Sequence, residues 1–337
     1  MHWFLWALTF AIINIPILTL LADRIFAVPT PQVIRYVWVP GAAVLAIVLT
    51  VARATDPPLL GLLKWGLIGG FLATVGLDVV RLFGHHVLRA FPVDMPQVFG
   101  MLALGLGPRL QENMIAGLVD GMAAADADTQ RRMLAKRLTA MVRLPEPVRV
   151  TVVRAMRKGL SALPEEDRQA MMQMQMTLLA EMPGVERRTV MRAVDLAMSD
   201  GFAPAYAQPR GMPKIPMTVA RELMGRALPR AAAEAGVPQS AVVLAGYGWH
   251  LLNGLGFGLT YMLLFGPGTW ALALAWGIFI WAGMMVTMPI MMPVIKFPMP
   301  RFLAVPFVAH IVMAVPIGYY ALQALRRCAA RRAFELA

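Results

Sequence analysis

Residues 246–261 read GYGWHLLNGLGFGLTY, an apolar stretch that contains a single imidazole, His250. In a helix, residues four positions apart lie on one face, so His250, Gly254 and Gly258 would form one stripe. Glycines at this spacing are typical of helices that pack closely against a neighbour inside a membrane. We therefore predict an apolar helix with a histidine at one end of a packing stripe.

The composition places this helix in a multi-pass membrane protein. The chain has 337 residues, of which 58% are hydrophobic and 15% are charged, and its mean hydropathy is +0.62, whereas soluble domains contain about a quarter charged residues. The net charge is +12, but the basic residues are concentrated in the middle of the chain and in the tail, which argues against nucleic-acid binding. The only cysteine, Cys328, excludes an intrachain disulfide and a cysteine-based zinc site.

Six apolar stretches are long enough to cross a bilayer, which takes about 20 residues. They cover approximately residues 3–22, 33–51, 60–83, 241–265, 269–293 and 302–325. The shorter stretch 95–107 has prolines at its start, Pro92 and Pro96, and we interpret it as a re-entrant or interfacial segment. The expected fold class is all-α: a polytopic membrane protein with about six transmembrane helices and an inserted soluble helical-repeat bundle.

The polar segment between residues 108 and 240 contains 19 Lys and Arg and 14 Asp and Glu, and it is the one expected soluble domain. A repeat of 19 residues runs through it at Leu144-Pro145, Leu163-Pro164 and Met182-Pro183. Because proline is favoured in the first turn of a helix, we predict short helices that begin near residues 145, 164 and 184. A further helix should precede them, capped by Asp126 or Asp128. Repeats of one helix cannot bury their faces alone, so they should stack into a bundle.

Three arginines occupy the same phase of the repeat, namely Arg149, Arg168 and Arg187. We interpret them as residues that dock a protein partner. Residues 201–218 are rich in proline and glycine and are typical of a linker. The amphipathic stretch that follows, about 219–235, could lie on the bilayer surface.

The chain thus divides into six segments along the sequence. They are two N-terminal transmembrane helices (1–58), a third transmembrane helix with the re-entrant hinge (59–107), the soluble bundle (108–200), the linker and amphipathic helix (201–240), three transmembrane helices (241–326) and a basic tail (327–337).

Six spans place both termini on one side of the membrane, and the arginines of the tail assign that side to the cytoplasm. The expected location is a bacterial inner membrane, with the helical insert in the periplasm. Lys296 and Arg301 lie between the fifth and sixth spans and oppose this orientation. The alternative uses residues 95–107 as a seventh span and brings the insert inside.

Ionisable groups recur at one expected depth in the membrane. His310 repeats the pattern of His250, and each lies about eight residues past the start of its helix, or roughly 12 Å at about 1.5 Å per residue. Asp78 stands at a comparable depth in the third span, and such groups rarely face lipid. With Met285 and Asp94, which is either a local cap or a lid, they form the candidate polar, metal or haem site.

Small residues on the same helices are expected to mediate packing rather than chemistry. The candidate packing positions are Gly66, Gly70, Gly254, Gly258 and Gly318. The run GLGFG is not a nucleotide-binding loop, because no strand precedes it.

Several motifs carry a family resemblance: GLIGGFLAT, FPVDMPQVFGML, GWHLLNGLGFGLTY, WAGMMVTMPIM and HIVMAVPIGYY. On these motifs, residues 64–105 and 246–325 resemble a group of small, uncharacterised four-helix bacterial inner-membrane proteins. The first two spans and the central domain depart from that pattern. The resemblance implies the architecture and no mechanism, and it puts Asp94, His250 and His310 inside the motifs.

Three functions remain open at this point. The first is a non-enzymatic accessory, assembly or scaffold subunit that docks a protein partner through its helical insert, with the histidines bonded to neighbours and fixing helix packing. The second is a redox membrane protein in which His250 and His310 hold haem b or, with Asp78, a transition metal. The third is a transporter of protons or small solutes.

Overall fold

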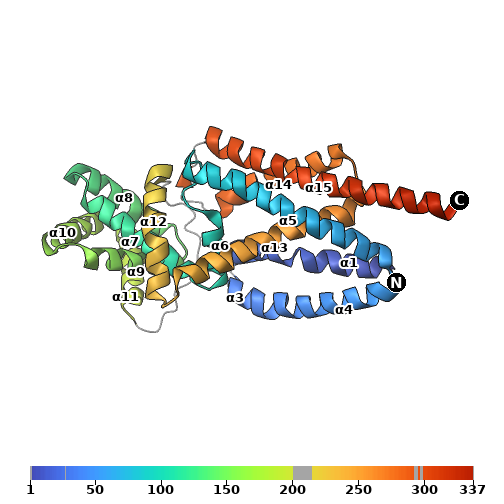
Figure 1. Ribbon diagram of the computed structural model, residues 1–337. Helices are drawn as coiled ribbons and strands as arrows, with labels where there is room; N and C mark the ends of the chain where they lie inside the picture. The colour runs from blue at the N-terminus through green and yellow to red at the C-terminus, as the bar shows by residue number, and fades with distance from the viewer. Residues whose placement is uncertain (1, 27, 200–214, 292–294, 297–298, 337) are drawn as a thin grey trace. The chain divides into compact units, whose positions relative to one another are not determined.

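The structure, a computed structural model, describes residues 2–26, 28–199, 215–291, 295–296 and 299–336. It is all-α as expected, apart from one parallel pairing of two residues, Ile215–Pro216 with Ile295–Lys296. Its contacts divide it into two units (Figure 1). The apolar unit comprises Met1–Leu104, Ser240–Met291 and Pro298–Ala337, and the repeat unit comprises Gly105–Gln239 and Met292–Phe297.

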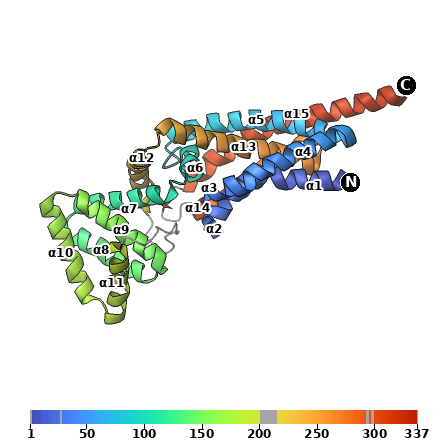
Figure 2. The same cartoon turned by 90° about the horizontal axis from the view of Figure 1, so that it is seen from below.

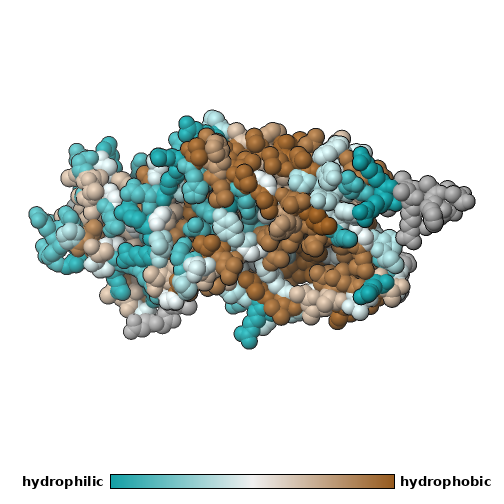
Figure 3. Space-filling model, in the orientation of Figure 1, coloured by the Kyte–Doolittle hydropathy of each residue, from teal (hydrophilic) through white to brown (hydrophobic). Residues whose placement is uncertain are grey.

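The apolar unit consists of long helices joined by short connections. Its elements are α1 (His2–Ile13), α2 (Ile15–Phe26), α3 (Thr30–Val33), the π-helical turn η1 (Ile34–Trp38), α4 (Val39–Thr55), α5 (Pro57–His86), α6 (Met95–Ala103), α13 (Gln239–Phe265), α14 (Trp270–Met291) and α15 (Met299–Leu336). Hydrophobic residues dominate the visible surface of this unit, and hydrophilic residues that of the repeat unit (Figure 3).

Among the described residues, four helical stretches are long and apolar enough to cross a membrane, and a bent helix pair makes a fifth. The four are Thr30–Thr55, Pro57–His86, Trp270–Met288 and Pro300–Arg327. Six were expected from the sequence, and the missing one is α13. It has 27 residues, but its glycines, Asn253, His250 and tyrosines lower its hydropathy.

The first expected span, residues 3–22, is not one straight helix. It is broken between α1 and α2, which meet at 46°. Pro16 has no N–H to donate to the carbonyl of the preceding turn, and the Asn14 side chain instead donates to Phe10 O at 2.8 Å. The break also faces α13, because Asn14 Nδ2 donates to Thr260 Oγ1 at 3.0 Å and Trp249 Nε1 donates to Pro16 O at 3.0 Å.

Glycines let α5 and α13 cross backbone to backbone. A Cβ added to Gly70 would lie 2.8 Å from Gly254 O, and one added to Gly66 would lie 3.0 Å from Gly258 O. A Cβ on Gly258 would in turn collide with the backbone of Gly66 and Gly70. The stripe beside His250 therefore packs on α5, as its spacing predicts.

The second histidine helix, α15, packs its stripe on α14 instead. A Cβ on Gly277 would lie 2.6 Å from His310 O and 3.0 Å from Ala314 Cβ, and one on Gly318 would lie 2.8 Å from the Trp270 ring. Helix α15 also runs along α5. The two histidine helices thus use equivalent stripes on different neighbours.

The repeat unit is a stack of helices of similar length (Figure 2). Its elements are α7 (Gly107–Ala123), α8 (Ala127–Val142), α9 (Glu146–Ala162), α10 (Glu165–Glu181), α11 (Gly184–Met198) and α12 (Met217–Glu234). Helices α9, α10 and α11 begin within one residue of the predicted positions, at intervals of 19 residues. Asp126 caps α8 by accepting from Thr129 N at 2.9 Å.

The prolines of the repeat precede the helices rather than lie in the first turn. Pro145, Pro164 and Pro183 are the residues immediately before α9, α10 and α11, with ψ of 146°, 150° and 140°. Each proline carbonyl accepts the first helical hydrogen bond, from the N–H of the repeat arginine four residues later, at 3.0, 2.9 and 2.9 Å. The repeat therefore encodes a helix start.

Arg149 is buried, so its expected role in docking a partner is wrong. Its guanidinium donates to Met141 O at 2.9 Å, in the last turn of the preceding helix, α8, and to Leu144 O at 2.6 Å, two residues after that helix ends. Arg187 reaches the end of α10 in the same way, through Ala180 O at 3.3 Å. Arg168 instead pairs with Glu165 at the surface. Cations at helix C-termini are favoured by the exposed carbonyls and the helix dipole, so the repeated arginine is a structural cap in two of three repeats.

Replacing Arg149 by methionine should destabilise the repeat unit by about 2 kcal/mol, because the carbonyls at the end of α8 would lose a charged donor inside the core. Replacing Arg168 by methionine should cost less than about 1 kcal/mol, since its ion pair is at the surface. Urea unfolding of the full-length protein in detergent, followed by hydrogen exchange of amides in α8, measures both. Equal effects would contradict the capping role of Arg149.

The amphipathic helix predicted at 219–235 is α12, and its apolar face does not need a bilayer. Leu223, Leu228 and Ala231 are buried, and α12 packs on α7. Most of the predicted linker, residues 201–218, lies outside the described residues, which resume at Ile215.

Glu234, at the end of α12, joins three helices of the repeat unit. Its carboxylate accepts from Lys158 Nζ of α9 at 2.7 Å, from Asn113 Nδ2 of α7 at 3.0 Å and from Arg230 Nε at 3.1 Å. Burial raises the pKa of Glu234, but the hydrogen bonds from Lys158, Asn113 and Arg230 outweigh it and lower this pKa from 4.5 to about 2.

The carboxylate of Glu234 should make stability depend on pH. Because its pKa is lower in the folded state, its contribution is fully present above about pH 4.5 and is lost as the pH falls towards about 2. We expect Glu234→Gln to lower the melting temperature of the full-length protein near neutral pH, and the difference from the wild type to shrink at about pH 3. A difference that is constant with pH would contradict this role of the ionised carboxylate.

Candidate functional site: a buried charge cluster beside an apolar cavity

A cluster of charged side chains is buried in the apolar unit, with Arg81 at its centre. Arg81 Nε donates to Asp78 Oδ1 at 2.9 Å, Nη1 donates to Asp94 Oδ1, and Nη2 donates to Tyr247 Oη at 3.2 Å. Tyr247 in turn donates to Asp94 Oδ2 at 2.8 Å. The side chains of Arg81 and Asp94 are only 7% and 8% exposed. The cluster joins α5, α13 and the start of α6.

Each member owes its position to a local feature of the chain. Asp78 and Arg81 are three residues apart on α5 and so lie on one face. Asp94 is the residue before α6, where an aspartate often caps the helix, but its side chain makes no cap hydrogen bond. Its carboxylate turns to Arg81 and Tyr247 instead. The prediction that the Asp94 side chain caps the helix is therefore wrong.

His250 adjoins this cluster through Asp78. Its Nε2 lies 2.9 Å from Asp78 Oδ1, an ion-pair distance, although the approach lacks the angles of a hydrogen bond. The predicted proximity of His250 and Asp78 is thus present. With a neutral imidazole the four ionisable groups sum to one negative charge, and with a protonated imidazole they sum to zero.

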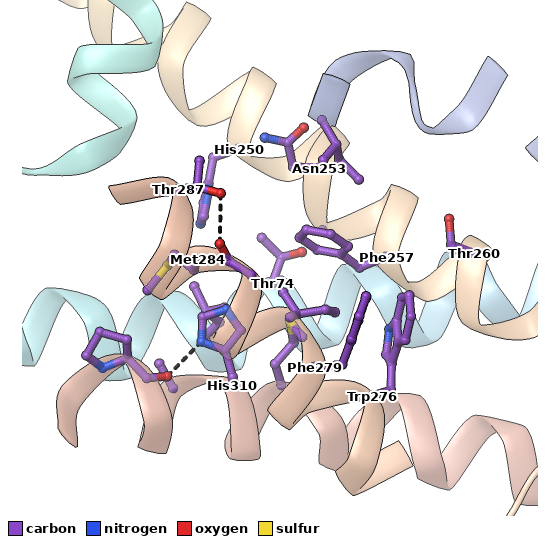
Figure 4. A pocket seen from close by; sticks show the side chains of 18 of the residues that line it. Thr74, His250, Asn253, Phe257, Thr260, Trp276, Phe279, Met284, Thr287 and His310 are labelled. Carbon is purple, nitrogen blue, oxygen red and sulfur yellow. Dashed lines mark hydrogen bonds between the residues drawn. The ribbon is translucent and has the colours of Figure 1, made fainter. Parts of the chain in front are cut away.

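His310 lies apart from the charge cluster. Its Nδ1 is 2.7 Å from Pro306 O, one turn earlier on α15, and the side chain is buried. A carbonyl oxygen can only accept, so Nδ1 carries the hydrogen in this bond. Both histidines nevertheless line one cavity (Figure 4).

This cavity has a volume of about 900 Å³ and lies between helices of the apolar unit. Its walls come from the α1–α2 pair, α5, α6, α13, α14 and α15. Most of the lining is apolar, and its larger side chains include Ile17, Phe99, Phe257, Trp276, Phe279 and Met284. The polar side chains in the lining are Asn14, Thr74, Arg81, His250, Asn253, Thr260, Thr287 and His310.

Comparison of the chain with family models, with curated proteins and with solved structures finds no match. The interpretation of the site therefore rests on its geometry.

The candidate metal ligands do not form a group of three or more among the described residues. Within the described parts of the chain, no group of three or more His, Cys, Asp and Glu side chains could hold a metal ion. His250 Nε2 faces a carboxylate and His310 Nδ1 a carbonyl, so each imidazole has one nitrogen engaged. Met285 does not line the cavity, whereas Met284 and Met288 of the same helix do.

Arg81 and Tyr247 are the members of the site that the sequence did not identify. The spacing of Arg81, three residues from Asp78 within an otherwise apolar run, is the one signal that could have indicated an internal ion pair. Asp94 joins the site because it binds Arg81, which is 13 residues away. No local sequence pattern indicates this contact.

Proposed function

We propose that the protein is a non-enzymatic, multi-pass membrane protein whose apolar unit binds an apolar molecule taken from the bilayer. The observation that carries this proposal is the cavity of about 900 Å³ between its helices. Ligand sites of about 300–1,000 Å³ with apolar walls and a few polar groups are typical of small-molecule binding, and they often lie between the helices of bundles.

The lining also selects the kind of molecule. Water is held in cavities by two to four polar partners each, whereas aromatic and aliphatic side chains make up most of these walls. The charge cluster supplies few groups to the cavity, because Arg81 directs its donors to Asp78, Asp94 and Tyr247. A hydrocarbon chain complements such a surface better than a small hydrophilic solute does.

Six crossings of the membrane are part of this proposal. The four apolar helical stretches and the bent pair α1–α2 supply five, and α13 is the sixth. At 27 residues α13 is about 40 Å long, enough to cross a bilayer. Gly254 and Gly258 pack on α5 and Gly246 packs on α6, so these glycines do not face lipid, which supports a crossing despite the lower hydropathy. With six crossings and a basic tail, we propose that both termini lie in the cytoplasm of a bacterial cell, with the protein in the inner membrane and the repeat unit in the periplasm.

Filling the cavity tests the proposal. Gly283 lines the cavity, and a Cβ added there would meet nothing within 4 Å. In lipid nanodiscs, a photoreactive long-chain hydrocarbon should label Phe257 and Met284 of the wild type, and Gly283→Trp should reduce this labelling about tenfold. Gly248→Trp is the matched control, since Gly248 also has open space but does not line the cavity. Labelling that Gly283→Trp leaves unchanged would overturn the proposal.

A haem or redox function has a separate readout. A visible absorption band of haem in the purified protein, lost in both His250→Ala and His310→Ala, would replace the ligand-binding proposal by a haem site. A colourless protein that keeps its hydrocarbon labelling supports ligand binding.

A second candidate function is protein docking through the repeat unit. Met172 and Met176 lie one turn apart on α10 and are 51% and 61% exposed, and residues 169–180 carry no charge. This face suits an uncharged, apolar helix of a membrane partner, because methionine adapts to such surfaces. Met172→Glu combined with Met176→Glu should abolish co-purification of that partner while hydrocarbon labelling in the cavity persists. Unchanged co-purification would count against docking.

A further inference from the structure

Two cations of the apolar unit contact the same indole ring. The guanidinium carbon of Arg327, the last residue of the apolar stretch of α15, lies 4.8 Å from the centroid of the Trp65 ring on α5. The ammonium nitrogen of Lys64, also on α5, lies 6.0 Å from the same centroid. Cations at such distances are attracted by the π electrons of an indole. The ring of Trp65 therefore brings two positive charges together.

Helix packing holds this ring in place. Trp65 stacks on Tyr320 of α15, with ring centroids 5.7 Å apart and planes at 24° to each other. Helices α5 and α15 run side by side (Figure 1), and a Cβ added to Gly69 would already touch Ile317 Cα at 3.5 Å. A guanidinium that lies over a ring keeps its N–H donors at its edge. Arg327 therefore presents these donors beside a ring that is held between two helices.

The two cations have no counter-charge among the described residues. Neither Lys64 nor Arg327 forms an ion pair there, and residues 57–77 of α5 and 299–327 of α15 contain no acid. Asp56 precedes α5, but it is buried and caps that helix. Like charges repel one another, so an anion beside the Trp65 ring would relieve a repulsion that the folded chain carries.

An exposed apolar stripe begins next to Lys64 on α5. Leu67, Phe71 and Val75 follow Lys64 at intervals of three or four residues, so their side chains share one face of the helix. They are 49%, 47% and 47% exposed. A cation at the end of such a stripe meets the head group of a lipid whose acyl chain lies along the stripe. This surface suits a lipid better than it suits a water-soluble anion.

We propose that the apolar unit binds an anionic phospholipid on its lipid-facing surface, with the phosphate beside Lys64 and Arg327 and an acyl chain along the stripe. The N–H groups of an arginine pair with phosphate oxygens in a bidentate manner, and a lysine adds a point charge. The lining of the cavity contains neither cation. The lipid site is therefore separate from the cavity and does not depend on the ligand that the cavity binds.

Binding of matched lipids tests this proposal. Native mass spectrometry of the full-length protein in a neutral detergent measures its affinity for dioleoyl phosphatidylglycerol and for dioleoyl phosphatidylcholine, which share acyl chains but differ in net charge. One cation near a membrane surface contributes about fivefold. Lys64→Gln and Arg327→Gln should each lower the affinity for phosphatidylglycerol about fivefold and leave that for phosphatidylcholine unchanged. The wild type should prefer phosphatidylglycerol by about twentyfold.

Two further variants separate this site from a general attraction by charge. Arg53→Gln removes one exposed cation from the last turn of α4, away from the Trp65 ring, and should change the affinity for phosphatidylglycerol by less than about twofold. Lys64→Arg keeps the charge and should keep the preference. Melting temperatures close to that of the wild type show that a loss of binding does not arise from unfolding.

Three results would overturn the proposal. The first is equal affinity for the two lipids, and the second is a loss in Arg53→Gln as large as that in Lys64→Gln. The third is displacement of phosphatidylglycerol by glycerol 3-phosphate, which has the phosphate without the chains, at a similar concentration; the site would then bind phosphate from solution. Labelling of the cavity by the photoreactive hydrocarbon should be the same in all of these variants.

Discussion

Replacing Arg81 by methionine is expected to destabilise the apolar unit by about 3–5 kcal/mol, the usual cost of removing one partner from a buried ion pair. The buried carboxylates of Asp78 and Asp94 would then lose the guanidinium that neutralises both of them. Tyr247 would lose one of its two partners in the cluster. The melting temperature and the urea midpoint of the protein in detergent measure the loss.

Neutralising the carboxylates as well should recover most of that stability. The triple variant Asp78→Asn, Arg81→Met and Asp94→Asn contains no buried charge in the cluster, and replacing whole buried ion pairs is often close to neutral. A triple variant as unstable as Arg81→Met alone would show that the effect of Arg81 arises from packing and not from charge compensation.

The second large effect is expected where α5 and α13 cross. Gly258→Leu should cost more than about 3 kcal/mol or prevent folding, because overpacking already costs about 1–3 kcal/mol where side chains can yield. At Gly258 the obstacle is the backbone of Gly66 and Gly70, which cannot rotate away. Yield of monodisperse protein and its melting temperature in detergent are the measurements.

Gly248→Leu is the matched control for this substitution. Gly248 lies on the same helix, α13, and a Cβ there would meet nothing within 4 Å. We expect a stability close to that of the wild type. Similar losses in Gly248→Leu and Gly258→Leu would mean that the close crossing of α5 and α13 is absent.

The periodic features of the chain could be predicted from the sequence. The 19-residue interval fixes where α9, α10 and α11 begin, because proline at a helix start acts locally. The spacing of Gly254 and Gly258 likewise indicates a close helix crossing, since a helix repeats on one face every four residues. Both patterns can be recognised in the sequence without knowing which helix packs against them.

The features that depend on a partner distant in the sequence could not be predicted. Arg149 looks like a surface arginine in the repeat, and only the fold shows that its guanidinium is enclosed at the end of α8. Asp94 and Tyr247 are 153 residues apart, and their hydrogen bond needs α6 and α13 to be placed together. The break of the first span at Pro16 carried a local signal, but the glycine-poor apolar run around it suggested one helix.

Hydropathy alone does not count α13 as a span, although we propose that it crosses the membrane. The criterion assumes that a crossing helix faces lipid, whereas α13 packs Gly254 and Gly258 on α5. Its Trp249 and Thr260 side chains bond to the break between α1 and α2. Labelling of single cysteines placed at both ends of α13, with a membrane-impermeant reagent on intact cells, would determine whether it crosses.

A crystal structure of the protein grown from a lipid mesophase tests the central claim most directly. Ligand binding predicts elongated non-protein density in the cavity, bordered by Phe257, Met284 and His310. A cavity closed by contact between the Phe257 and Met284 side chains, with no density between them, would contradict it.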